Sequence, residues 1–135
     1  MRPLYEDSTS LGNEEAVLAR LKQRWHCVGF KLPIAYRLDY ALVEDGRVQA
    51  WAEIKCRGKR YEEMYLSLHK WMAGKELADK TGLPFLLVYA FGVNIYWKRV
   101  DEDTPRLVIG GRTDRKDWQD TEPMAVFALK DFNPL

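Results

Sequence analysis

Apolar residues recur at helical spacing near the start of the chain. In "LGNEEAVLARLKQRW" the apolar positions form one stripe, made by Val17, Leu18, Leu21 and Trp25. Asn13 can cap a helix here, and the early glutamates suit its positive end. Glu14 lies on the apolar stripe, three and four residues before its first members. The pattern therefore predicts a helix whose Glu14 carboxylate points toward the body of the protein.

Residues 34–56, "IAYRLDYALVEDGRVQAWAEIKC", alternate in a way that is typical of a β-hairpin. The even positions are apolar or aromatic: Tyr36, Leu38, Tyr40, Leu42, Val48, Ala50, Ala52 and Ile54. The odd positions carry Arg37, Asp39, Arg47, Gln49, Glu53 and Lys55. We expect the even face to enter the core and the charged odd face to point outward.

The two arms bury the same face only if directly paired residues have an even sum of residue numbers. A two-residue Asp45-Gly46 loop pairs Glu44 with Arg47 and mixes the faces. A three-residue loop with Gly46 in the left-handed region pairs Val43 with Arg47 and keeps the faces coherent. The sequence therefore predicts a type I turn followed by a G1 bulge.

The rest of the chain continues the alternation of helix and strand. "CRGKR" is a basic loop, and "YEEMYLSLHKWMAGKELADKTG" is predicted to be a long second helix that ends at Gly82. "PFLLVYAF" is an apolar run typical of a strand buried on both faces, and after Gly92 "VNIYWKRV" is another strand. Short strands are predicted at 106–109 and 125–129, and a solvated loop at "GGRTDRKDW".

This order is helix, strand, strand, helix, strand, strand. A strand–helix–strand crossover implies some parallel pairing, so we expect an α/β domain with a mixed sheet flanked by helices. Residues 1–135 fit one domain, with a core at about 13–99 and a loop-rich extension at 100–135. The aromatic strands "LLVYAF" and "VNIYWKRV" are candidates for a homodimer interface.

Composition adds little beyond an ordinary globular protein. The chain has 135 residues, of which 47% are hydrophobic and 30% charged, and its formal net charge is +1. That charge neither favours nor excludes a nucleic-acid partner. No apolar run approaches the roughly 18 residues of a membrane span, and "MRPLYEDSTS" lacks a signal-peptide core, so we expect a cytoplasmic protein. Its two cysteines are expected to be free thiols.

Four residues carry candidate chemistry: Glu14, Asp39, Glu53 and Lys55. Carboxylates that converge at one place repel each other unless a cation lies between them, and oxygen ligands suit Mg²⁺ or Mn²⁺. Residues at i and i+2 of a strand share a side, so Glu53 and Lys55 point the same way while Ile54 packs inward. The predicted bulge brings Asp39 to that face. Taken alone, Glu-x-Lys on a strand is more often a solvated face.

Asp39, a turn and then Glu53-Ile54-Lys55 resemble the PD-(D/E)xK nuclease superfamily, which has the restriction-endonuclease-like fold. The likeness covers about residues 13–91, and small phage-type nucleases and Holliday-junction resolvases are the most similar members. Leu38 stands where the motif has proline. The resemblance implies a Mg²⁺- or Mn²⁺-dependent nuclease acting on DNA.

The resemblance also assigns roles. Asp39 and Glu53 would bind the metal with the Ile54 backbone carbonyl, Lys55 would activate water or contact phosphate, and Glu14 would be a helix-borne ligand. Auxiliary polar residues of the second helix would be Ser67 and Lys70. Contacts to DNA would come from Arg57, Lys59, Arg60 and Trp51.

Alternatives remain at this point. The basic cluster after Lys55 is nearly as easily a solvated loop, and Trp51 could instead pack under the first helix. The chain could also be an inactive nuclease-fold module that binds nucleic acid or has a structural role. In a third interpretation the hairpin is unrelated to nucleases, and its charged face is simply exposed to solvent. The form of the substrate is open.

Overall fold

The computed structural model describes residues 13–111 and 121–135. The helices are α1 (Glu14–Trp25) and α2 (Leu68–Thr81). The strands are β1 (Val28–Lys31), β2 (Tyr40–Glu44), β3 (Arg47–Arg57), β4 (Glu63–Ser67), β5 (Phe85–Phe91), β6 (Asn94–Arg99), β7 (Arg106–Gly111), β8 (Thr121–Ala128) and β9 (Asn133–Pro134). Short 3₁₀ turns lie at Ile34–Tyr36 and Leu129–Asp131. Most of the predicted solvated loop "GGRTDRKDW" falls outside the described residues.

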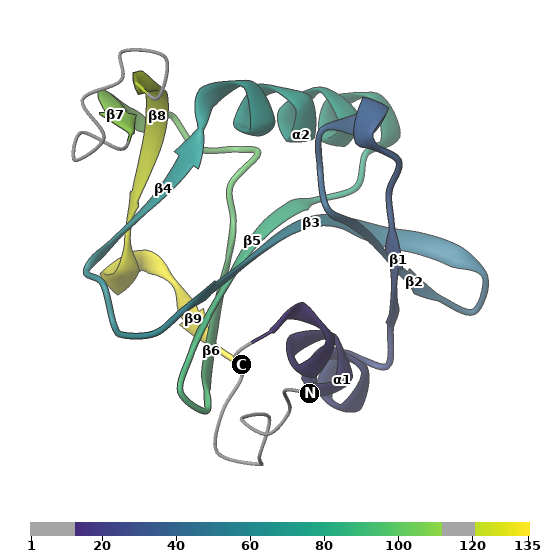
Figure 1. Cartoon of the computed structure of the whole chain (residues 1–135). Helices are drawn as coiled ribbons and strands as arrows, with labels where there is room; N and C mark the ends of the chain where they lie inside the picture. Colours follow the sequence, from purple (N-terminus) through teal and green to yellow (C-terminus); the bar gives the residue numbers. More distant parts are fainter. Residues whose placement is uncertain (1–12, 112–120) are drawn as a thin grey trace.

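The strands form two sheets, and the larger one is mixed. Its order is β1-β2-β3-β5-β6-β9, and β4-β8-β7 make a second, three-stranded sheet. Figure 1 shows α1 against one face of the large sheet, with α2 and the small sheet on the opposite side. The parallel pairing implied by the crossover is confirmed, because β3 and β5 run parallel from Trp51/Phe85 to Arg57/Phe91. The predicted mixed α/β architecture is therefore confirmed.

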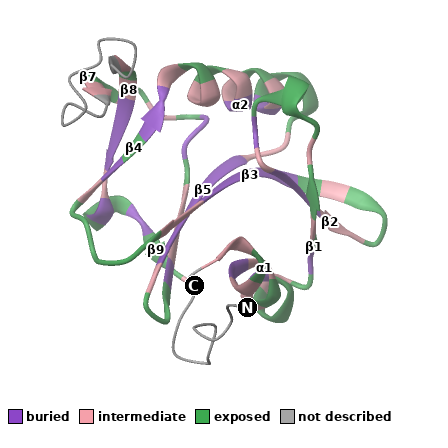
Figure 2. Cartoon of the chain, in the orientation of Figure 1, coloured by how far each residue is buried: buried purple, intermediate pink, exposed green. Residues whose placement is uncertain are grey.

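The large sheet is buried on both faces at its centre, as the purple strands β3 and β5 in Figure 2 illustrate. One apolar cluster joins the even positions of the hairpin to α1, with Val17 and Leu21 fully buried. A second cluster joins odd positions, Trp51 among them, to α2 and the small sheet. The expectation that the odd face points outward is therefore wrong. Glu53 lies on this covered face and is only 2% exposed.

The first helix forms as predicted. The Asn13 side chain accepts a hydrogen bond from the Ala16 N–H at 2.9 Å, which satisfies one of the free donors at the helix start. The helix ends with His26 in the left-handed region at φ 58°. The strand β1 that follows was not predicted, because its four residues are too short to show a period.

The hairpin turn differs from the prediction. Glu44 pairs directly with Arg47 across Asp45-Gly46, and both turn residues have positive φ, 53° and 76°. Those angles are typical of a type I′ turn, so the predicted G1 bulge is wrong. The register shifts instead between Leu42 and Val43, because Leu42 pairs with Ala50 and Val43 with Val48. On the side of the shift away from the turn, the numbers of paired residues have even sums, which is the condition for both arms to bury the same face.

The segment predicted as the start of the second helix is the strand β4. Met64 and Leu66 are buried and Tyr65 is exposed, which is the period of a strand. β4 pairs with β8, a strand far away in the sequence. The helix α2 begins only at Leu68 and ends, as predicted, at Gly82 with φ 75°. Helical spacing of apolar residues before Leu68 was therefore misleading.

The last third of the chain contributes to both sheets. The predicted short strands are confirmed as β7 and β8, and β8 supplies the buried Ala125 and Phe127. β9 pairs with β6. Since β5 lies between β3 and β6, "LLVYAF" cannot form a dimer interface as predicted. None of the described helices is long and apolar enough to cross a membrane.

Gly74 sets how closely α2 approaches β5. A Cβ atom built on Gly74 would lie 2.3 Å from the Phe85 ring, and Phe85 is fully buried. We expect Gly74→Val to lower the free energy of unfolding by about 2 kcal/mol or more through overpacking. Urea denaturation followed by circular dichroism measures this. The control Gly58→Val, at a loop position with no atom within 4 Å of its Cβ, should stay within about 0.5 kcal/mol. Equal losses in the two variants would contradict the close approach.

Candidate active site

The site is built around the buried carboxylate of Glu53, in the middle of β3. Its Oε2 accepts a hydrogen bond from the Lys70 Nζ at 2.8 Å. Its other oxygen, Oε1, has no hydrogen-bond partner among the described residues. Lys70 lies on the first turn of α2, which packs over this face of the sheet. The fold thus brings the predicted auxiliary residue Lys70 directly to the predicted ligand Glu53.

This pair has the electrostatics of charges removed from water. Burial raises the pKa of Glu53, and the nearby Asp39 raises it further, while the hydrogen bond from Lys70 opposes both. Burial tends to lower the pKa of Lys70, but its hydrogen bond to Glu53 raises the pKa overall. Each side chain therefore favours the charged form of the other, although burial leaves the pKa of Glu53 raised overall.

Asp39 lies just before β2, next to the strand that carries Glu53. Its Oδ2 is 3.4 Å from the Ile54 N, which donates toward it. Ile54 lies beyond the last pair of β2 and β3, Tyr40 with Ala52. The N–H and C=O of one strand residue point to the same side, so the Ile54 carbonyl also faces the Asp39 side. This orientation agrees with the predicted role of that carbonyl.

Lys55 is half-buried near the same charges. Its ammonium forms no hydrogen bond or ion pair with any residue that the structure describes. Burial lowers the pKa of Lys55, and Arg57 lowers it further, while Glu53 acts in the opposite direction. A lysine with a lowered pKa gives up its proton more readily, which suits the predicted role at a reacting water.

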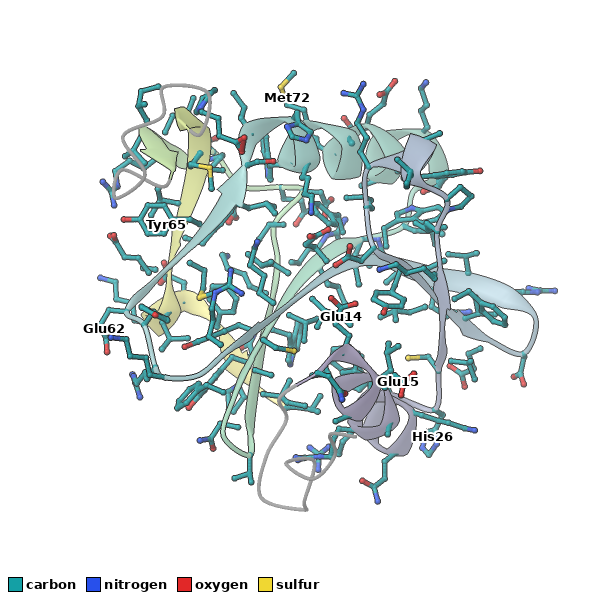
Figure 3. The ribbon with its side chains drawn as sticks, viewed as in Figure 1. Glu14, Glu15, His26, Glu62, Tyr65 and Met72 are labelled. Atoms are coloured by element: carbon teal, nitrogen blue, oxygen red, sulfur yellow. The ribbon has the colours of Figure 1, made fainter. Side chains whose placement is uncertain are left out.

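Glu14 reaches the edge of the site but is held there by other partners. Figure 3 shows Glu14 on the side of α1 that faces the central strands. Its Oε1 accepts a hydrogen bond from the Tyr40 hydroxyl at 2.7 Å. Lys31 Nζ lies 3.7 Å from Glu14 Oε1 and 3.9 Å from Asp39 Oδ1, so this ammonium bridges the two carboxylates. Sequence reasoning missed Lys31 because the strand that carries it was not predicted.

Carboxylates and lysines alternate in this arrangement, which bears on its fit to a metal ion. Within residues 13–111 and 121–135, no group of three or more His, Cys, Asp or Glu side chains is close enough to hold a metal. Lysines instead neutralise the carboxylates: Lys70 on Glu53, and Lys31 between Asp39 and Glu14. The unpartnered Glu53 Oε1 is a buried oxygen that a cation would satisfy. The oxygen donors therefore fit a hard divalent cation if Lys31 moves aside.

The predicted DNA contacts divide into exposed and buried residues. Arg57, Lys59 and Arg60 are exposed beyond the end of the site, and Arg60 pairs with Glu62 at 3.1 Å. Trp51 is only 8% exposed, and its Nε1 donates to Thr81 Oγ1 at 3.1 Å. Both interpretations of Trp51 are therefore wrong, because it packs under α2 and offers no face to a base.

Ser67 lies at the end of β4, where α2 begins. It is buried, and its Oγ lies 3.3 Å from His69 Nδ1. No described contact joins it to Glu53 or Asp39. Its auxiliary role stays a prediction.

The comparison with protein families decides the class. A family model described as "Phage putative PDDEXK endonuclease" matches residues 1–135. The chain belongs to this family. Its members are PD-(D/E)xK nucleases, as the Asp39 and Glu53-Ile54-Lys55 pattern predicted. PD-(D/E)xK nucleases generally use divalent metal ions.

A solved structure agrees with the family at the level of fold. The Holliday junction resolvase Hjc of Archaeoglobus fulgidus, an archaeal hyperthermophile, superposes with a TM-score of 0.53 at 18% identity. The match covers 69% of this chain and 82% of Hjc. The predicted restriction-endonuclease-like fold is confirmed. A comparison with curated protein sequences finds no match.

One buried tyrosine shapes the basic loop that follows Lys55. The Tyr89 side chain is fully buried on β5, yet its hydroxyl reaches that loop. It accepts a hydrogen bond from the Tyr61 N–H and donates one to the Lys59 carbonyl, both at 2.8 Å. These two bonds fix the segment that carries Arg57, Lys59 and Arg60.

We expect Tyr89→Phe to loosen this loop. The change removes the partner of the Tyr61 N–H and of the Lys59 carbonyl, which should cost about 0.5–1.5 kcal/mol for each bond. Hydrogen exchange at the Tyr61 amide should become faster than in the wild type, and urea denaturation should show the loss. Tyr65→Phe is the control, because among the described residues the Tyr65 hydroxyl hydrogen-bonds only to the half-buried Glu63, at 3.2 Å, in a contact open to solvent. An unchanged rate of hydrogen exchange at the Tyr61 amide would contradict the role of the Tyr89 hydroxyl in holding this loop.

Proposed function

We propose that the protein is a divalent-metal-dependent deoxyribonuclease that hydrolyses phosphodiester bonds with Asp39, Glu53 and Lys55. The observation that carries this proposal is the half-satisfied carboxylate of Glu53: its buried Oε1 lacks a partner, and the nearby Asp39 raises its pKa. A carboxylate kept for stability alone would have both oxygens bonded. Membership of the nuclease family supports the same conclusion.

Asp39, Glu53 and the Ile54 carbonyl would hold the metal ion, with Mg²⁺ or Mn²⁺ as the cation that fits oxygen ligands. When bound, such an ion lowers the pKa of water and neutralises charge on the phosphoryl oxygens. Glu14 would contribute after releasing Lys31, an ammonium whose side chain is 63% exposed and therefore moves at little cost.

The lysines have separate roles in this proposal. Lys55, whose pKa is lowered by burial, positions the attacking water and accepts its proton or contacts the scissile phosphate. Lys70 orients Glu53 through the 2.8 Å bond and favours its ionised form. The exposed Arg57, Lys59 and Arg60 lie where the flanking phosphates of DNA can be bound.

Cleavage of DNA tests the proposal directly. We expect cleavage with Mg²⁺ or Mn²⁺ in a panel of plasmid, linear duplex, single strand and four-way junction, the last included because Hjc is a Holliday junction resolvase. Asp39→Asn, Glu53→Gln and Lys55→Ala should each lower the rate by about a hundredfold or more. Asp79→Asn, which changes a 63% exposed carboxylate of α2, should not.

Two results would contradict the proposal. Activity that survives both Asp39→Asn and Lys55→Ala would exclude the proposed site. Absence of cleavage of every substrate by the folded wild type would favour an inactive nucleic-acid-binding or structural module. Circular dichroism of each variant separates loss of chemistry from loss of fold.

Metal binding can be tested without any reaction. Millimolar Mn²⁺ should raise the melting temperature of the wild type, because an ion bound only by the folded state adds RT ln(1 + [ion]/Kd), about 2.7 kcal/mol at a hundred times Kd. Asp39→Asn should lose most of that rise, while Asp79→Asn should keep it. Differential scanning fluorimetry measures both, and an equal rise in all three proteins would place the ion elsewhere.

A further inference from the structure

The segment between β1 and β2, residues 32–39, forms a closed turn that we call the 32–39 turn. At its neck the Leu32 N–H donates to the Asp39 carbonyl at 2.9 Å. Inside it, Tyr36 N–H donates to the Pro33 carbonyl at 3.0 Å and Arg37 N–H to the Ile34 carbonyl at 2.9 Å. The buried Leu38 anchors the turn in the core. Its shape is therefore preformed, and its neck includes a candidate catalytic residue.

The turn holds an apolar side chain out in water. Ile34 is 95% exposed, and Tyr36 of the same turn is 44% exposed. Single exposed apolar residues are common on protein surfaces and need no explanation by themselves. Ile34, however, sits on a braced turn at the wall of a groove, where its position relative to the site is constant.

The groove runs between the 32–39 turn and α2. One hollow is lined by residues that include Ile34, Asp39 and Lys70, and a second by residues that include Tyr36 and Lys80. Arg37 and His69 line both hollows, so the two are continuous. Figure 1 shows the dark-blue turn beside α2. The groove therefore leads from the surface of α2 to the candidate catalytic carboxylate Asp39.

The charge of this groove suits a polyanion. Its cationic residues are Lys31, Arg37, Lys70 and Lys80, and its acidic residues are Asp39 and Glu76. Lys31, Lys70 and Lys80 are each paired with a carboxylate. The Arg37 guanidinium forms no hydrogen bond or ion pair with any described residue, although it stands where the hollows meet. It is thus free to bind a phosphate.

We propose that this groove binds a DNA strand whose bases are unpaired, with a phosphate on Arg37 and a base face against Ile34 and Tyr36. An apolar side chain reaches a base face only where stacking is interrupted, because neighbouring base pairs cover those faces in continuous duplex. The groove would therefore select frayed, branched or single-stranded DNA over intact duplex. This inference rests on the proposed function and specifies the substrate class of that site.

Binding without catalysis tests the inference. The full chain is titrated in EDTA against fluorescein-labelled DNA of three kinds: a blunt duplex, a fork with an unpaired arm, and a single strand of matching length. We expect the fork and the single strand to bind about tenfold more tightly than the blunt duplex, the size of one base–side-chain stacking contact. Ile34→Ser should abolish this preference. Ile109→Ser is the matched control, since Ile109 is 74% exposed on β7, away from the groove.

Arg37 gives an independent readout. Arg37→Gln should weaken binding to all three DNAs, and the slope of log K against log salt should fall by about one, as loss of one phosphate contact predicts. Arg24→Gln on α1 is its matched control. Both substituted groove residues are exposed, so the variants are expected to fold.

The inference is overturned if wild type binds fork and blunt duplex equally, or if Ile34→Ser and Ile109→Ser behave alike. Failure of the proposed nuclease function is distinguished from failure of the groove by adding the metal ion, which is needed for cleavage and is absent from the binding experiment. A protein that prefers the fork in EDTA but cleaves nothing with Mg²⁺ or Mn²⁺ would refute the nuclease activity and leave the binding groove intact. Cleavage of DNA with Mg²⁺ or Mn²⁺ by a protein that shows no preference for the fork in EDTA would support the nuclease activity and refute the binding groove.

Discussion

The contact between Glu53 and Lys70 is the constraint around which the molecule is arranged. A carboxylate in the middle of a sheet that is covered on both faces is removed from water, which is costly unless an opposite charge lies against it. Lys70 supplies that charge from the first turn of α2. The helix must therefore begin close to the sheet centre, and Gly74 permits the approach because its missing Cβ leaves room for Phe85.

A second buried carboxylate shows why Glu53 is unusual. Asp101 is 4% exposed, and its oxygens accept hydrogen bonds from the Phe85 N–H at 2.9 Å and from Arg99 at 2.9 and 3.0 Å. Burial acts to raise the pKa of Asp101, but these bonds lower it overall. For Glu53 the balance is reversed, since one oxygen is unpartnered and the pKa is raised. Asp101 has the bonding of a structural acid, whereas Glu53 keeps an oxygen available for a ligand.

Local patterns predicted the elements whose neighbours are close in sequence. The capped helix α1, the apolar run of β5 and the parallel β3–β5 pair all follow from short-range signals. The strand β4 was missed because its partner β8 lies some sixty residues away, and because Met64 continues the helical spacing of α2. The charged motif was found from its spacing alone. The burial of Glu53 was not predicted, because it depends on where α2 packs. The contact of Lys31 with the carboxylates was not predicted either, because Lys31 lies on β1, a strand too short to recognise from the sequence.

The hairpin shows what the parity of paired residue numbers can predict and what it cannot. Burying one face required one extra residue somewhere between the turn and the site, and parity says nothing about where. Asp45 and Gly46 both adopt left-handed angles, so the tight turn keeps two residues and the insertion falls at Gln49, which is exposed. An extra residue there disturbs no core contact. From Ala50 onward the numbers of paired residues sum to 92, whereas the predicted bulge, which pairs Val43 with Arg47, gives 90. Continued one residue past the pair of Tyr40 with Ala52, the observed register sets Asp39 opposite Glu53. The predicted register would have set Asp39 opposite Trp51. Parity alone therefore does not build the site, because the position of the inserted residue decides which side chain lies opposite Asp39.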